Sequence, residues 1–87
     1  MEPFYFEMTD TYGGDLNYCW LQRYTVYANN LKGALMKMSK ATGYHFRFNG
    51  SYYKVKGACI ALYALEYELY DDDDWFQRST KIGEIQS

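Results

Sequence analysis

The sequence predicts an α+β domain of two layers, with one helix packed across an antiparallel sheet of four or five strands in β-β-α-β-β order. Strand-like alternation at both ends of the chain, a helical stripe at residues 31–42 and an Asn-Gly turn signal lead to this prediction. Because the chain has 87 residues, we expect one compact domain over residues 1–76 and a polar tail over residues 77–87.

The first two strands are expected to form a hairpin. Residues 4–9 alternate between two faces, and Gly13 and Gly14 permit the positive φ angles of a tight connection. The second strand spans about residues 18–27. We expect one of its faces to lie against the core, because it carries the larger apolar surface: Tyr18, Trp20, Tyr24 and Val26.

A helix is predicted after Asn29 or Asn30, either of which can cap the first turn. Gly43 can end the helix in the left-handed conformation. The helix is expected to bury a stripe at positions i, i+3, i+4, i+7 and i+11, which are Leu31, Ala34, Leu35, Met38 and Thr42.

The rest of the chain predicts strands at residues 44–48 and 52–56, joined at Asn49-Gly50. Residues 58–70 fit either a helix by composition or a strand by alternation, and we choose a strand. The aspartates that follow must end it, because adjacent carboxylates repel one another and Asp is depleted in strands.

The charge changes sign along the chain. Residues 1–15 hold four acids and no base, residues 16–65 hold seven bases and no acid, and residues 66–74 hold six acids and no base. Like charges kept apart in sequence can give the folded domain an electropositive and an electronegative region, each suited to a partner of opposite sign. Eighteen aromatic residues are more than so small a core can enclose, which favours protein contact.

Enzymatic and metal-binding functions have little support. His45 is the only histidine, without the partners that proton chemistry requires. Cys19 and Cys59 are too scattered for a zinc site, and we expect buried, unpaired thiols. The apolar run at residues 58–65 is too short to cross a bilayer, and no signal peptide is evident. We therefore expect a soluble cytoplasmic protein that is not an enzyme and has no cofactor.

The acidic run has three interpretations: a solvated turn, a calcium loop, and a mimic of a phosphate row that enters a groove built for nucleic acid. A calcium loop is a weak match, because its ligands alternate and its turn needs a glycine. Neighbouring aromatic residues favour mimicry, because rings add anchors to the steering that charge provides. The candidate partner-binding residues are Glu66, Tyr67, Glu68, Tyr70, Asp71, Asp72, Asp73, Asp74 and Trp75.

The alternative is a module that binds single-stranded nucleic acid, since basic groups interleaved with rings hold such strands. The low pI of about 5.2 ranks it second. Its bases could instead pair with Glu7 and Asp10 across the sheet. The candidate residues are Arg23, Tyr27, His45, Arg47, Tyr53 and Lys54, and Lys56 could replace Lys54.

Three runs, at residues 6–14, 17–20 and 55–60, resemble a group of very short phage-encoded proteins of unassigned role. The resemblance covers roughly residues 4–68 and carries no motif with known chemistry, and Asp71 to Asp74 lie beyond it. It implies a phage accessory protein of the anti-CRISPR or host-defence-inhibitor type, acting in the host cytoplasm. The partner would then be a host nucleic-acid-binding protein, for example a CRISPR effector.

Overall fold

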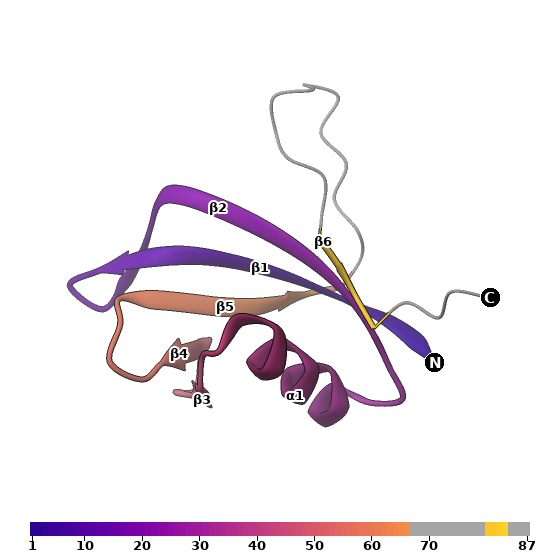
Figure 1. The fold of residues 1–87 in the computed structure, drawn as a ribbon. Coiled ribbons are helices and arrows are strands. Elements are labelled where there is room, and N and C mark those ends of the chain that lie inside the picture. Colours follow the sequence, from indigo (N-terminus) through magenta and orange to yellow (C-terminus); the bar gives the residue numbers. More distant parts are fainter. Residues whose placement is uncertain (67–79, 84–87) are drawn as a thin grey trace, which may run out of the picture.

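A computed structural model describes residues 1–66 and 80–83 of the chain (Figure 1). Within these residues one helix packs on one sheet. The elements are β1 (Glu2–Tyr12), β2 (Asp15–Ala28), α1 (Leu31–Thr42), β3 (Phe46–Phe48), β4 (Tyr53–Val55), β5 (Ile60–Leu65) and β6 (Thr80–Ile82).

The sheet has the strand order β3-β4-β5-β1-β2-β6. Neighbouring strands from β3 to β2 are antiparallel, and β6 pairs with β2 in parallel. The predicted α+β class with one helix on an antiparallel sheet is confirmed. The predicted element order is incomplete, because four described strands follow the helix; β6 lies within residues 77–87, which the sequence analysis treated as a tail.

The long β1–β2 hairpin is the centre of the sheet. β1 pairs with β2 along one edge and with β5 along the other, so β1 is covered on both sides. Gly13 and Gly14 form the turn with φ angles of 61° and 86°, a region that L side chains rarely adopt. The Tyr52 hydroxyl donates a hydrogen bond of 2.8 Å to the carbonyl of Gly14, which ties the β3–β4 loop to this turn.

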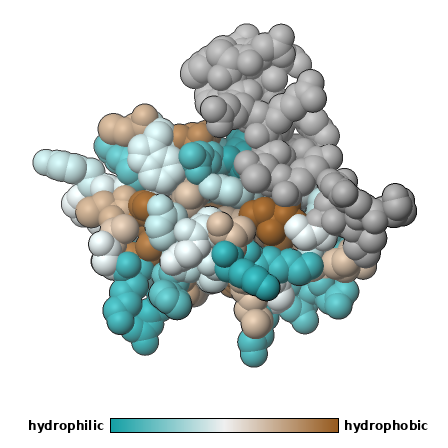
Figure 2. Space-filling view, viewed as in Figure 1, coloured by the Kyte–Doolittle hydropathy of each residue, from teal (hydrophilic) through white to brown (hydrophobic). Residues whose placement is uncertain are grey.

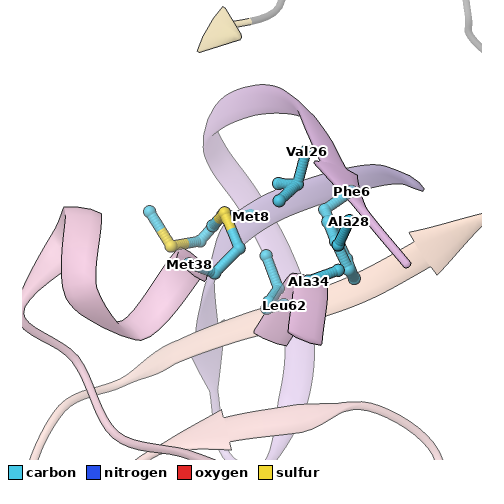
Figure 3. Packing of buried hydrophobic residues seen from close by; sticks show 7 residues of the cluster. All are labelled: Phe6, Met8, Val26, Ala28, Ala34, Met38 and Leu62. Atoms are coloured by element: carbon cyan, nitrogen blue, oxygen red, sulfur yellow. The ribbon is translucent and has the colours of Figure 1, made fainter. Parts of the chain in front are cut away.

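The core lies between α1 and the facing side of the sheet (Figure 3). Burying one large apolar side chain stabilises the fold by on the order of 1.5–3 kcal/mol, so a few such side chains supply much of the stability of a small domain. Figure 3 labels the buried cluster, which consists of Phe6, Met8, Val26, Ala28, Ala34, Met38 and Leu62.

Both ends of α1 are capped as its sequence predicts. The side chain of Asn30 accepts a hydrogen bond of 2.8 Å from the N–H of Gly33, and Gly43 has a φ of 77°. Ala34 and Met38 are fully buried, but Leu31 is 39% exposed, so the expectation that Leu31 belongs to the buried stripe is wrong. Leu31 stands at the first helical position, beyond the part of α1 that covers the core.

The second hairpin is shorter than expected. Its strands cover Phe46–Phe48 and Tyr53–Val55, because the Asn49 side chain accepts backbone N–H groups of Ser51 and Tyr52 and so builds a four-residue loop. The choice of a strand within residues 58–70 is confirmed for Ile60–Leu65, and residues 67–70 lie outside the described residues. Cys19 and Cys59 are free, as expected, but both are exposed rather than buried.

Candidate functional site

The residues on either side of the acidic segment, residues 66–79, lie in one row across the sheet. Leu65 pairs with Tyr5, Tyr5 pairs with Thr25, and Thr25 pairs with Lys81, which makes one row across β5, β1, β2 and β6. Neighbouring strands lie about 4.8 Å apart, so the two ends of this row are roughly 14 Å apart. The sheet therefore fixes the two attachment points of residues 66–79 in the same row.

Among the nine candidate partner-binding residues, the structure describes Glu66. This residue is exposed and follows the last residue of β5 directly. The other eight lie outside the described residues, and their placement stays a prediction: Tyr67, Glu68, Tyr70, Asp71, Asp72, Asp73, Asp74 and Trp75.

Tyrosines of β1 and β2 lie close to the row in which this segment is anchored. Tyr5 belongs to the row itself, and Tyr24 and Tyr27 lie within two positions of Thr25. Tyr5 and Tyr27 are half-buried on the sheet face opposite α1, whereas Tyr24 lies on the α1 face and packs against the core cluster. Burial raises the pKa of Tyr24, and Tyr44 acts in the same direction, which favours neutral hydroxyls.

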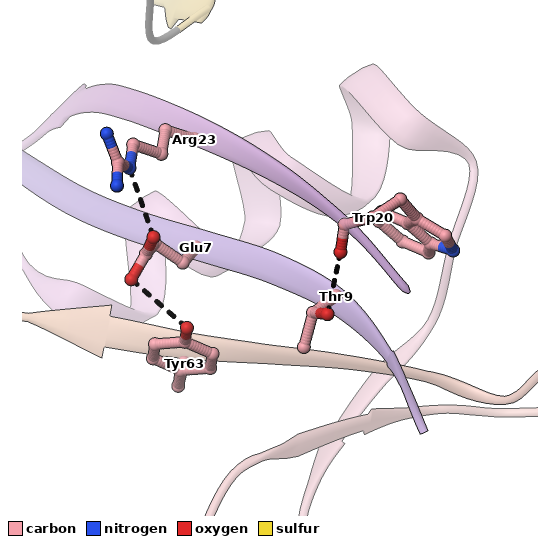
Figure 4. Close-up of polar contacts among 5 residues, drawn as sticks. All are labelled: Glu7, Thr9, Trp20, Arg23 and Tyr63. Carbon is pink, nitrogen blue, oxygen red and sulfur yellow. Dashed lines mark hydrogen bonds and ion pairs between the residues drawn. The ribbon is translucent and has the colours of Figure 1, made fainter. Parts of the chain in front are cut away.

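Arg23, a candidate for nucleic-acid binding, is engaged inside the protein (Figure 4). Its Nε donates a hydrogen bond of 3.0 Å to Oε2 of Glu7, and the two side chains are only 13% and 7% exposed. The hydroxyl of Tyr63 donates to the other oxygen of Glu7 at 3.1 Å. The alternative in which a base pairs with Glu7 across the sheet is thus confirmed for Arg23.

The Tyr63 hydroxyl is held in its neutral form. Burial raises the pKa of Tyr63 well above its usual range, and the neighbouring Tyr18 hydroxyl and Glu7 carboxylate act in the same direction. This cluster of Glu7, Arg23 and Tyr63 lies on the sheet face opposite α1, one residue from each of three adjacent strands. We infer a structural role for it, since its hydrogen bonds satisfy a buried carboxylate.

The strand registers place Arg23, Tyr27, Arg47 and Lys54 on the sheet face opposite α1, where Arg23 is bound to Glu7. Arg47 and Lys54 pair across β3 and β4 and are both exposed, so they do lie together. Tyr53 points to the opposite face, where its ring lies 5.0 Å from that of Phe48. His45 is exposed just before β3, whereas Tyr27 lies on β2 opposite Pro3. The expectation that these side chains share one face of the sheet is therefore wrong for Tyr53, which packs on the core side.

A bulge in β2 exposes aromatic residues that the sequence analysis assigned to the core. Thr9 pairs with Leu21 and Thr11 with Leu16, so four residues of β2, 17–20, lie opposite the single residue Asp10. The exposed fractions of Tyr18 and Trp20 are 55% and 37%. The expectation of a buried face fails for these two, because the extra residues interrupt the alternation that period-2 arguments assume.

Side chains of β1 occupy the hydrogen-bonding groups of this bulge. The Thr9 hydroxyl donates a bond of 2.7 Å to the carbonyl of Trp20 (Figure 4). The Asp10 carboxylate accepts from the side chain of Asn17 at 2.8 Å and from the N–H of Cys19 at 2.7 Å. These bonds, that from Asn17 foremost, lower the pKa of Asp10, so the bulge is built around an ionised carboxylate.

Tyr18 carries backbone strain. Its φ is 57°, the one positive value for a residue other than glycine in the described ranges. A bulky side chain rarely adopts this conformation, and strain of this kind costs on the order of 1–3 kcal/mol. Tyr18, Trp20 and the 81% exposed Tyr12 lie near the β1–β2 turn, away from the row of the sheet that contains Leu65 and Lys81.

Comparisons with known protein families, with curated proteins and with solved structures found no match to this chain. Across the described ranges, no helix combines the length and the apolar character that crossing a bilayer requires. The described residues also hold no group of three or more histidine, cysteine or acidic side chains arranged for a metal ion.

Proposed function

We propose that this chain is a non-catalytic binding protein, a phage-encoded inhibitor of the anti-CRISPR type. It engages a host protein that normally binds nucleic acid, through an acidic surface edged by aromatic residues. The observation that carries the proposal is the anchoring of residues 66–79 at both ends in one row of the sheet, at Leu65 and Lys81.

Anchoring matters because it limits where the carboxylates can go. Residues 66–74 contribute six acids and no base, and their two attachment points on the sheet are roughly 14 Å apart. Six carboxylates within nine residues make a polyanion that can take the place of closely spaced phosphates, to which lysine and arginine clusters bind electrostatically. Such a protein competes with nucleic acid for the same groove.

Aromatic residues supply what charge alone lacks. Electrostatic attraction mainly speeds association, whereas buried rings slow dissociation. Tyr5 and Tyr27 are half-buried next to the anchoring row, and the sequence places Tyr67, Tyr70 and Trp75 within or beside the acidic run. The resemblance to short phage proteins supports a host target.

The test is capture from nuclease-treated bacterial lysate with the tagged protein, followed by binding measurements on each purified candidate. A variant with Asp71, Asp72, Asp73 and Asp74 changed to asparagine keeps side-chain size and removes the charge. A matched control carries Glu2→Gln and Asp15→Asn, which neutralise exposed acids of β1 and β2. We expect nucleic-acid-binding proteins to be captured by the wild type and the control, and affinity to drop about tenfold or more for the asparagine variant.

Salt provides a second readout. The affinity of the wild type is expected to fall steeply between about 50 and about 300 mM salt, and that of the asparagine variant to fall less. Equal affinities of wild type and variant at every salt concentration would reject the acidic surface as the binding site. A partner that has no nucleic-acid-binding activity would reject the mimicry.

A further inference from the structure

A second surface, lined by no residue of 66–79, lies between α1 and the start of β3. It is an open groove of about 720 Å³. Its lining consists of Leu31, Lys32, Leu35, Met36, Ser39, Lys40, His45 and Phe46. The groove lies beside β3, at one edge of the sheet, whereas β6 forms the opposite edge.

The floor of the groove is apolar and in contact with solvent. Leu31 and Met36 are 39% and 64% exposed, although burying large apolar side chains usually lowers the free energy of the protein. Leu35 and Phe46 are partly buried and pack against the core cluster, so they give the groove a fixed wall. An exposed apolar surface with a polar rim is typical of an interaction site.

The rim is cationic. Lys32 and Lys40 line the groove, and no acidic residue is among its lining. Within residues 1–66 and 80–83 neither lysine has an ion pair, whereas Lys37, the third lysine of α1, donates to the carbonyl of Tyr27. Figure 2 shows hydrophilic side chains projecting from the lower side of the molecule, where Figure 1 places α1 and β3, with smaller apolar patches among them.

The spacing of the two lysines defines the partner. They are eight residues apart on one helix, which corresponds to about 12 Å along its axis at 1.5 Å per residue. A partner helix with carboxylates at positions i and i+8 has the same spacing, and apolar residues between them would cover Leu31, Leu35 and Met36. An amphiphile with one anionic headgroup could meet only one lysine, and a phosphate backbone would leave the apolar floor uncovered.

From this charge complementarity we propose that the groove binds an acidic amphipathic helix of a protein partner. The apolar face of that helix packs on Leu31, Leu35, Met36 and Phe46, and its carboxylates pair with Lys32 and Lys40. None of the residues that line this groove belongs to residues 66–79.

The test uses a fluorescein-labelled amphipathic peptide with glutamates at i and i+8 and leucines on the same face between them. A second peptide has glutamine in place of both glutamates, and a third has lysine. Fluorescence anisotropy with the full-length protein measures each affinity. We expect the glutamate peptide to bind in the micromolar range and about tenfold tighter than the glutamine peptide.

Protein variants locate the binding. In the double variant Lys32→Glu, Lys40→Glu, the affinity for the glutamate peptide is expected to fall by about tenfold or more. The affinity for the lysine peptide should rise, which an unfolded protein could not produce. The matched control Lys54→Glu, Lys56→Glu, with exposed lysines outside the groove, should bind as the wild type does. Met36→Ser should weaken binding through the apolar floor without affecting the core.

Three results would overturn the proposal. The first is no preference for the glutamate peptide over the glutamine peptide up to about 1 mM. The second is unchanged binding by the Lys32→Glu, Lys40→Glu variant. The third is another occupant: phosphatidylglycerol vesicles, single-stranded DNA or a second copy of the chain, each bound through Lys32 and Lys40 more tightly than the peptide.

Discussion

Glu7 on β1 and Arg23 on β2 form a largely buried ion pair, with 3.0 Å between Nε and Oε2. They are paired residues of two antiparallel strands, on the face of the sheet that α1 does not cover. The pair engages one of the bases of the alternative nucleic-acid surface, because the Arg23 guanidinium is directed at an internal carboxylate.

Replacing Arg23 by methionine should destabilise the fold strongly. The Glu7 carboxylate would stay buried with Tyr63 as its remaining hydrogen-bond donor among the contacts described above, and removing one partner of a buried pair costs about 3–5 kcal/mol. Urea unfolding measures this loss. The double variant Glu7→Gln, Arg23→Met should recover part of it, and a loss under about 1 kcal/mol in the single variant would contradict a structural pair.

Thr9→Val should loosen the β2 bulge. Valine keeps the shape of threonine but cannot donate to the carbonyl of Trp20, and the loss of one such bond costs about 1 kcal/mol. Thr11→Val, on the same strand, is the matched control, because the Thr11 contact described here is made by its backbone N–H, to Cys59. Trp20 fluorescence should shift in the first variant, and equal changes in both would exclude this role of Thr9.

The raised pKa of Tyr63 makes stability fall at alkaline pH. Its folded pKa lies above the ordinary value of 10.0, so the stabilisation is complete below pH 10 and declines above it, where the unfolded chain ionises first. Unfolding measured between about pH 9 and about pH 11 should show this decline, less steeply in Tyr63→Phe. Tyr12→Phe, at an exposed position, should leave the slope unchanged; an equal slope in all three proteins would contradict the assignment.

The nucleic-acid alternative makes a separate prediction. Arg47 and Lys54 are exposed neighbours, but Arg23 is bound to Glu7 and Tyr53 packs on the other face beside Phe48. Two cations without a stacking ring should hold a single strand weakly and without length dependence. We expect no electrophoretic shift of labelled single-stranded RNA or DNA at moderate salt. A shift that disappears in Arg47→Ala, Lys54→Ala would revive the alternative.

Much of the fold was predictable because its signals are local. The Asn30 cap, the Gly43 end of α1 and the turn glycines Gly13 and Gly14 act within a few residues, and each does in the structure what its sequence predicts. The strand choice at Ile60–Leu65 was correct, since pairing with β1 and β4 outweighs the helical propensity of alanine and leucine there.

The errors arise from long-range pairing. Strand β6 has three residues and pairs in parallel with a strand more than fifty residues earlier, and no local pattern indicates this. Regular alternation predicts Tyr18 and Trp20 in the core. The bulge shifts the register of β2 and exposes them, and it depends on Thr9 and Asp10 of the neighbouring strand. The groove on α1 was not predicted, because Leu31 was expected in the core. The spacing of apolar residues along a helix does not distinguish a residue that packs in the core from one that contacts a partner.

The central claim, that residues 66–74 take the place of nucleic acid on a host protein, is tested most directly by competition. A captured partner is loaded with labelled nucleic acid, and increasing amounts of the chain are added. The account predicts full displacement by the wild type and by the Glu2→Gln, Asp15→Asn control, and about tenfold weaker displacement by the Asp71–Asp74 asparagine variant. A stable ternary complex of chain, partner and nucleic acid would contradict it.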